Sequence, residues 1–327
     1  MANKKSGSVR KNGKKTTAPG APSPVDAWIL AARPKTLAAA SSPVIVALAL
    51  AYRDIIEGRA RTDCFLMAPA LCCLAFAVLA QVAANFINDY ADYKKGTDTE
   101  KRKGPARAVA SGWITPRAML IGTFVALGAA CLFGLATLPF AGALGWGRLV
   151  AVGVACCVFC VLYSAGPLPL AYIGLGDVLV VAFFGIVAVC FTYGVQTERI
   201  TLDAVLTGTA IGFAADNILV ANNYRDRDED RAAKKYTLIA IFGERFGRYF
   251  YLVNGVIVVA LLATVFERRD LWNGVVLGAL VVYFALHLWA WRTLSRIREG
   301  QGLVRVLAMS SQNLLILSVM LAIGVAL

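Results

Sequence analysis

The sequence predicts an all-α integral membrane protein, a polytopic bundle of nine transmembrane helices. Its composition is the first reason, because 58% of the 327 residues are hydrophobic and only 16% are charged. An ordinary globular chain has about 25% charged residues. The second reason is that apolar stretches long enough to cross a bilayer recur along the chain. The third is that Lys and Arg gather in alternate connecting segments, as the positive-inside rule requires.

The chain divides into a basic tail and one membrane domain. Residues 1–25 are basic and rich in Gly, Ser and Pro, so we expect a disordered cytoplasmic tail. A cleaved signal peptide is not expected, because the next apolar run starts late and is interrupted by Arg33-Pro34-Lys35. Residues 26–327 then form a single nine-helix domain.

Nine apolar stretches are candidates for membrane spans, and the first and fourth are short enough to need flanking polar residues. They are residues 37–52, 64–87, 118–138, 149–163, 176–195, 202–222, 249–266, 271–290 and 306–327. With the N-terminus inside, the cytoplasmic segments carry 26 of the 33 Lys and Arg residues. This asymmetry predicts a cytoplasmic N-terminus and an exported C-terminus.

The net charge of +13 does not indicate nucleic-acid binding, because the basic residues lie in short blocks between apolar runs and no nucleic-acid-binding motif accompanies them. The eight cysteines do not indicate zinc. Cys157 and Cys160 have CxxC spacing, but no second pair lies nearby and His287 is the only histidine. We expect packing roles for the cysteines and for His287.

Two cytoplasmic segments are rich in aspartate, and we expect them to be loops that carry the chemistry. The first runs from Asn88 to Thr99 and the second from Asn222 to Arg231. If the flanking helices continue into them, Asp89 and Asp92 share a helix face at i, i+3. Asp226 and Asp230 share one at i, i+4.

Clustered carboxylates repel one another unless a cation lies among them. Oxygen ligands without His or Cys favour Mg²⁺, which completes its shell with water and phosphate oxygens. The two segments therefore suggest a diphosphate held between two Mg²⁺-binding helices. Two alternatives are solvated loops of mixed charge and an ion-coupled transporter. Transporter sites usually lie near the midplane, whereas these acids lie at cytoplasmic ends beside Lys and Arg.

These motifs resemble those of the UbiA superfamily of intramembrane aromatic prenyltransferases, and the likeness covers almost everything after the tail. The signatures are an Asn-Asp-x-x-Asp motif (Asn88 to Asp92) and an Asp-x-x-x-Asp motif (Asp226 to Asp230). The likeness also includes Ala32 to Leu37, Gly104-Pro105, Ser111-Gly112, Tyr163 to Leu170, Gly174 to Asp177, and Asn222 through Leu238.

Within the superfamily the chain is similar to the 1,4-dihydroxy-2-naphthoate branch. Many relatives place an aspartate where this chain has Gly96, and Gly96-x-Asp98-Thr99 is the naphthoate pattern, so Asp98 can take over as a ligand. The segment from Tyr163 to Leu170 lacks the basic pair of the hydroxybenzoate and haem relatives. The chain departs from the branch at Lys234, usually Gly, and Ile239, usually Ala.

The resemblance implies transfer of a polyprenyl group from a polyprenyl diphosphate to 1,4-dihydroxy-2-naphthoate, with loss of CO₂, in a bacterial cytoplasmic membrane. The isoprenoid would lie in an apolar groove open to membrane lipid. 4-Hydroxybenzoate is the alternative acceptor. The implied Mg²⁺ ligands are Asp89, Asp92, Asp98, Asp226 and Asp230, with Asn88 beside them. Implied substrate-binding residues are Arg33, Lys35, Asn222, Asn223, Arg225 and Lys235, with Tyr90 or Tyr163 facing the allylic cation. Asp216, inside the sixth span, is an ionisable group at membrane depth and could contact the acceptor.

Overall fold

The computed structural model describes residues 22–96, 106–166, 169–297, 300 and 302–327, and every regular element in these residues is helical. The predicted all-α membrane bundle is confirmed. The helices are α1 (Pro24–Ala32), α2 (Pro34–Ile56), α3 (Met67–Lys95), α4 (Pro116–Leu135), α5 (Trp146–Leu162), α6 (Gly176–Val181), α7 (Ala188–Thr197), α8 (Leu202–Ala232), α9 (Leu238–Arg269), α10 (Gly274–Arg296) and α11 (Gly302–Ala326). A π-helical segment, η4 (Ala182–Val187), joins α6 to α7. Three short 3₁₀ turns, η1 (Leu138–Phe140), η2 (Gly142–Leu144) and η3 (Leu170–Tyr172), lie in the connections.

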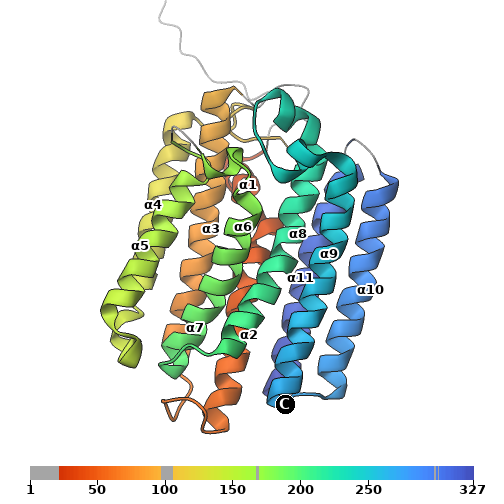
Figure 1. Ribbon diagram of the computed structural model, residues 1–327. Helices are drawn as coiled ribbons and strands as arrows, with labels where there is room; N and C mark the ends of the chain where they lie inside the picture. Colours follow the sequence, from red (N-terminus) through yellow and green to blue (C-terminus); the bar gives the residue numbers. More distant parts are fainter. Residues whose placement is uncertain (1–21, 97–105, 167–168, 298–299, 301) are drawn as a thin grey trace, which may run out of the picture.

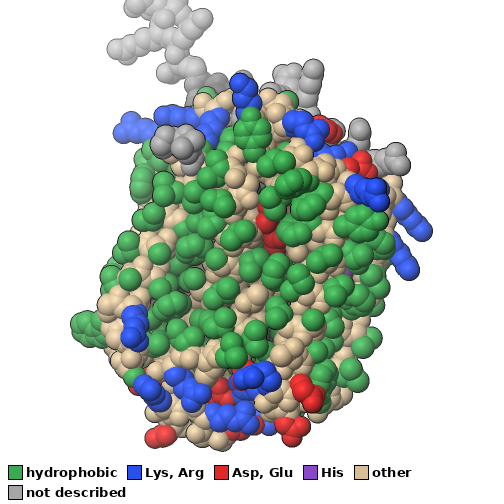
Figure 2. Space-filling model, viewed as in Figure 1, with side chains coloured by type: hydrophobic (Ala, Val, Ile, Leu, Met, Phe, Trp, Pro, Cys, Tyr) green, Lys and Arg blue, Asp and Glu red, His purple; other side chains and the backbone are tan. Residues whose placement is uncertain are grey.

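Long helices that follow one another in the chain run antiparallel, and the first described residues and the C-terminus lie at opposite ends of the bundle (Figure 1). Within the described residues, eight helices are long and apolar enough to cross a membrane, counting α6 to α7 as one. The chain is therefore an integral membrane protein. α5, with 17 residues, is shorter than these eight, so the count of nine spans stays a prediction. Figure 2 shows a broad apolar belt with charged side chains concentrated at its two ends.

The aspartate-rich segments are helical where the structure describes them, so the prediction that they are loops was wrong. α3 continues through its motif to Lys95, and α8 continues through the second motif to Ala232. α3 ends because Gly96 adopts a left-handed conformation (φ 65°) and donates its N–H to the last turn. Each helix thus projects above its apolar run, and the carboxylates of each motif are held on a rigid helix end.

The helix α1 lies at the same end of the bundle as the two motifs. No helix was predicted from the sequence for these residues. Ser23 caps it by accepting the N–H of Asp26, and Pro24 begins its first turn. Arg33, with φ 52°, separates α1 from α2. The last two residues of the predicted tail, Pro24 and Val25, therefore belong to the start of α1. Residues 1–21 lie outside the described part.

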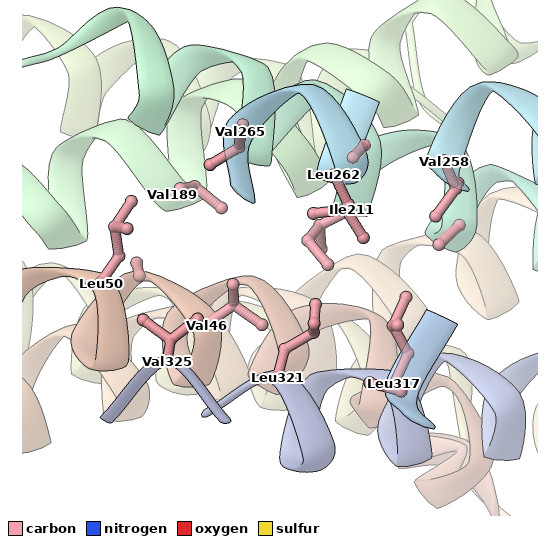
Figure 3. Close-up of a cluster of buried hydrophobic side chains, with 14 of the residues drawn as sticks. Val46, Leu50, Val189, Ile211, Val258, Leu262, Val265, Leu317, Leu321 and Val325 are labelled. Atoms are coloured by element: carbon pink, nitrogen blue, oxygen red, sulfur yellow. The ribbon is translucent and has the colours of Figure 1, made fainter. Parts of the chain in front are cut away.

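The largest apolar core joins helices from both halves of the chain. In Figure 3, Val46 of α2 and Val189 of α7 lie in the same cluster as Ile211 of α8, Leu262 of α9 and Leu317 of α11. Each of these side chains is buried. Since α2 and α11 belong to opposite ends of the sequence, this core closes the bundle.

Close backbone packing fixes α6 to α7 against α8. A Cβ placed on Gly185 would lie 2.4 Å from the carbonyl oxygen of Gly208 and 2.6 Å from Cα of Gly212. Small residues allow this approach, which is a common way to join helices in a membrane. The π-helical segment contains Gly185, and its extra residue per turn sets the rotation of α6 relative to α7.

Lys234, where the naphthoate branch usually has Gly, lies in the turn between α8 and α9. Lys234 has φ 56°, in the left-handed region where Gly has no Cβ clash. The turn is held because Arg231 donates two hydrogen bonds to the Ala240 carbonyl, at 3.0 and 2.7 Å. Ile239, the second departure, is fully buried against Tyr224 and Gly247. Both substitutions are therefore accommodated locally.

Candidate active site

A cavity of about 620 Å³ begins at the end of the bundle where α1 lies, and one residue of each aspartate motif lines it, although the motif aspartates themselves do not. Asn88, the first residue of the α3 motif, and Asn222, the first of the α8 motif, both line this cavity. Asp92 and Asp230 are close enough to interact electrostatically. The fold thus brings together two segments more than 130 residues apart, as the sequence predicted.

The rest of the cavity is an apolar channel. On α3 its lining runs from Asn88 to Cys73, which corresponds to about 22 Å at 1.5 Å per residue. Polar side chains gather at the motif end, where Arg33, Thr36 and Asn85 line it. The remaining walls are mostly apolar side chains, among them Leu138, Leu149, Val154, Phe183 and Phe191. This shape suits a long hydrocarbon with a polar head.

In the first motif, Arg107 holds Asn88 and Asp92 together. Its Nη2 donates to Oδ2 of Asp92 at 2.7 Å and to Oδ1 of Asn88 at 3.2 Å. Arg107 follows α3 in the connection to α4 and is 9% exposed. Arg107 was not among the predicted site residues, because the spacing of residues in the sequence does not show that this connection folds back onto α3.

Asp89 has a different environment from Asp92. It is only 1% exposed, and its two oxygens accept the backbone N–H groups of Ala108 and Val109 at 3.0 and 3.2 Å. A buried carboxylate bonded in this way has its charge stabilised by the protein. That Asp89 is also a metal ligand stays a prediction. Asp89 anchors the segment that presents Arg107.

In the second motif, each carboxylate is paired with a cation. Arg225 donates Nε and Nη2 to the two oxygens of Asp226, each at 2.5 Å, and Nη2 also reaches Oδ1 of Asn222 at 2.8 Å. Lys235 Nζ lies 3.1 Å from Oδ1 of Asp230. The other Asp230 oxygen, Oδ2, is buried and has no hydrogen-bond partner in the described structure. That oxygen is available to a ligand.

A second layer of positive charge lies between the motifs and the connection after α5. Lys95 donates to the carbonyl of Ser164 at 3.1 Å and lies 4.1 Å from the ring centroid of Tyr172. Lys235 lies 5.9 Å from the same ring. Tyr172 is held to the α8–α9 turn because its carbonyl accepts the N–H of Tyr236 at 2.9 Å. Lys95 and Tyr172 were not among the predicted site residues: Lys95 lies within the first aspartate-rich segment, and Tyr172 lies between two segments of the resemblance, Tyr163 to Leu170 and Gly174 to Asp177.

The residue types at the site suit Mg²⁺, but among the described residues no three acidic, His or Cys side chains lie close enough together to form a metal-binding group. Asp92, Asp226 and Asp230 supply oxygen atoms only, and Asp230 keeps one buried oxygen without a donor. Hard cations prefer such ligands, and Mg²⁺ usually takes few carboxylates and leaves positions for phosphate and water. The neighbouring amides of Asn88 and Asn222 offer further oxygen ligands.

Only some of the remaining predicted residues line the cavity. Arg33, Tyr163 and Asn222 line the cavity, whereas Lys35 is exposed and does not. Tyr90 packs in an apolar cluster with Trp28 and Ile114, and Asn223 is buried without lining the cavity. Asp98 lies outside the described residues. His287 is buried and stacks on Tyr251, with ring centroids 4.9 Å apart.

The sequence matches a known protein family over most of its length. Residues 40–311 match the model of the UbiA prenyltransferase family. The chain belongs to the UbiA prenyltransferase family. Among curated UbiA relatives, 1,4-dihydroxy-2-naphthoate octaprenyltransferase of Escherichia coli is 34% identical over 76% of this chain and 79% of its own length. The Mycobacterium tuberculosis protein of the same name is 34% identical over 84% of this chain and 87% of its own.

Solved UbiA structures share the fold. A UbiA homologue from Aeropyrum pernix, in its apo form, superimposes with a TM-score of 0.62 over 86% of this chain and 96% of its own, at 17% identity. A UbiA homologue from Archaeoglobus fulgidus bound to DMAPP and Mg²⁺ gives 0.60 over 90% of this chain and 99% of its own, at 14% identity. At these identities the likeness concerns the fold alone.

Proposed function

We propose that this protein transfers a polyprenyl group from an allylic polyprenyl diphosphate to 1,4-dihydroxy-2-naphthoate, with loss of CO₂. The observation that carries the proposal is the single cavity that joins two aspartate motifs to an apolar channel. A polyprenyl diphosphate has the same division into a charged head and a hydrocarbon tail. The names of the curated bacterial relatives support the acceptor.

In this proposal Asp92, Asp226 and Asp230 hold Mg²⁺, with Asn88 and Asn222 beside them. The metal would neutralise charge that develops on the diphosphate as the allylic carbon–oxygen bond breaks. Arg107, Arg225 and Lys235 already lie against these carboxylates and can turn toward phosphate oxygens. Cations placed in advance at a site of developing negative charge lower the barrier to ionisation.

The allylic cation would form at the junction of the polar and apolar parts of the cavity. Tyr163 lines the cavity at this junction, and its aromatic ring can stabilise a cation. Arg33 lies at the same end and adds positive charge near the head group. The electron-rich ring of the acceptor then attacks the allylic carbon. Water would be kept from the cation by the apolar walls.

A competition assay tests the proposal. Purified protein, Mg²⁺ and a polyprenyl diphosphate are supplied with carboxyl-labelled 1,4-dihydroxy-2-naphthoate and with 4-hydroxybenzoate. We expect faster turnover of the naphthoate and release of the label as CO₂. Preference for the benzoate, or label retained in the prenylated lipid, would refute the acceptor assignment.

We further propose that the active site faces the bacterial cytoplasm. The support is that the aspartate motifs lie at the same end of the bundle as α1, which follows the basic N-terminal residues. A reporter fused after Leu327 at the opposite end should be active in the exported compartment. Reporter activity in the cytoplasm would reverse the orientation.

A further inference from the structure

Two buried carboxyl groups lie beside the candidate active site but belong to neither motif. Asp177 is in the first turn of α6 and Asp216 is in the middle of α8. They are 4% and 0% exposed, and their side chains are close enough to interact electrostatically. Asp216 lies ten residues before Asp226, which places it about 15 Å deeper along α8.

The two carboxyls cannot both carry a negative charge. Asn254 donates Nδ2 to Oδ2 of Asp216 at 3.0 Å, while Oδ1 of Asp177 and Oδ1 of Asp216 find no donor in the described structure. In that part of the chain neither carboxyl pairs with Lys or Arg. Two facing carboxylates without a cation cannot both be ionised in an apolar interior. The pair therefore holds at most one negative charge and can accept one more proton.

Tyr163 connects this pair to the cavity. Its side chain lines the cavity, and its hydroxyl oxygen lies 3.4 Å from the position of a Cβ on Gly176, the residue before Asp177. Tyr163 is also close enough to Asp177 and Asp216 to interact with them electrostatically. A phenol in this setting is protonated and can pass a proton between the cavity and Asp177.

The packing of the two helices holds the pair in place. The contact between Gly185 and Gly208 fixes α6 to α7 against α8 at a point eight residues from each acid, slightly more than two turns. Ionisable groups at membrane depth are costly and are usually retained for function.

We propose that Asp177 and Asp216 are the proton acceptor of the prenyl transfer reaction and that Tyr163 relays the proton from the acceptor hydroxyl. This inference rests on the proposed function. It adds a general base that the two metal-binding motifs do not supply.

The acceptor O–H bond breaks and its proton passes to Tyr163, while the Tyr163 proton passes to the carboxylate of the pair. The electron pair left on oxygen moves into the ring, a ring carbon bonds to the allylic carbon, and the bond to diphosphate breaks. When the attacked carbon carries the carboxylate, CO₂ leaves and its bonding electrons return to the ring. The resulting oxyanion takes back the proton, so the pair is regenerated.

Isosteric variants test the proposal. Asp216→Asn and Asp177→Asn should lower kcat for the naphthoate by about 10²-fold, the usual range for loss of a general base, with KM for the polyprenyl diphosphate nearly unchanged. Tyr163→Phe should act in the same direction. Asp203→Asn is the matched control, because it makes the same change on α8 in an ion pair whose partner, Arg268, is 47% exposed.

Acceptors with a more acidic hydroxyl distinguish between two roles of these residues, that of a general base and that of a purely structural support. A hydroxyl that is already ionised in solution needs no base, so the ratio of wild-type to variant kcat should fall from about 10²-fold to less than about 10-fold. A ratio that stays constant across the acceptors, in every variant that folds, would overturn the proposal. So would near-normal kcat in both Asp variants. If wild-type protein prefers another phenolic acceptor, the proposed function fails, and the same ratios measured with that acceptor still decide the role of the pair.

Discussion

Arg225 donates both Nε and Nη2 to the carboxylate of its sequence neighbour Asp226, at 2.5 Å each. Arg107 donates to one oxygen of Asp92 at 2.7 Å, and Lys235 donates to one oxygen of Asp230 at 3.1 Å. Without a metal, these cations neutralise carboxylates that would otherwise repel one another. We expect metal and diphosphate to arrive together, because the cations that leave the carboxylates then gain phosphate oxygens as partners.

The metal ligands can be tested by removing one charge at a time. Asp92→Asn and Asp226→Asn should each lower kcat by at least about 10²-fold while the protein still inserts and folds, because loss of a ligand removes several kcal/mol of leaving-group stabilisation. Asp228→Asn is the control, since its side chain is 51% exposed. Turnover near the wild-type rate in both Asp92 and Asp226 variants would contradict the metal site.

Asp89 should behave as an anchor and not as a ligand. In Asp89→Asn one of the two backbone N–H groups, of Ala108 or Val109, loses its acceptor, which costs about 1–3 kcal/mol. We expect a lower free energy of unfolding in detergent and reduced activity, with the Mg²⁺ concentration for half-maximal activity unchanged. A large increase in that concentration would show that Asp89 binds the metal after all.

The fold class and the pairing of the two motifs could be predicted from the sequence, because apolar length and charge asymmetry are local properties. The helix ends could not, since Asn88 to Lys95 and Asn222 to Arg231 are polar yet helical. Likewise, the i, i+3 spacing of Asp89 and Asp92 does not reveal that the later segment around Arg107 folds back and gives them different roles. α1 did have a local signal in Ser23-Pro24-x-Asp26, a capped helix start.

The strained residue in the α8–α9 turn offers a stabilising change. Lys234 has φ 56°, a conformation that costs a residue with a Cβ about 1–2 kcal/mol. Lys234→Gly should therefore raise the free energy of unfolding by about 1 kcal/mol. Lys234→Ala keeps the Cβ and removes the charge, so it should change stability little. Equal effects of the two substitutions would show that the side chain, and not the backbone, matters.

A buried ion pair stabilises the end of the bundle opposite the active site. Arg269 of α9 donates Nη1 to Oδ2 of Asp54 at 3.2 Å and Nη2 to its other oxygen, and Tyr193 of α7 donates its hydroxyl to the same carboxylate. The arginine and aspartate side chains are only 4% and 2% exposed. Arg269→Met leaves the Asp54 charge buried and unpaired, which should cost about 3–5 kcal/mol.

The exposed pair between Arg268 and Asp203 provides the comparison. The Arg268 side chain is 47% exposed, so Arg268→Ala should cost at most about 1 kcal/mol. Adding Asp54→Asn to Arg269→Met removes the unpaired charge and should recover a large part of the lost stability. The measurement is unfolding in mixed detergent micelles with increasing SDS. An Arg269→Met variant as stable as Arg268→Ala would mean that water or lipid head groups reach Asp54 and stabilise its charge.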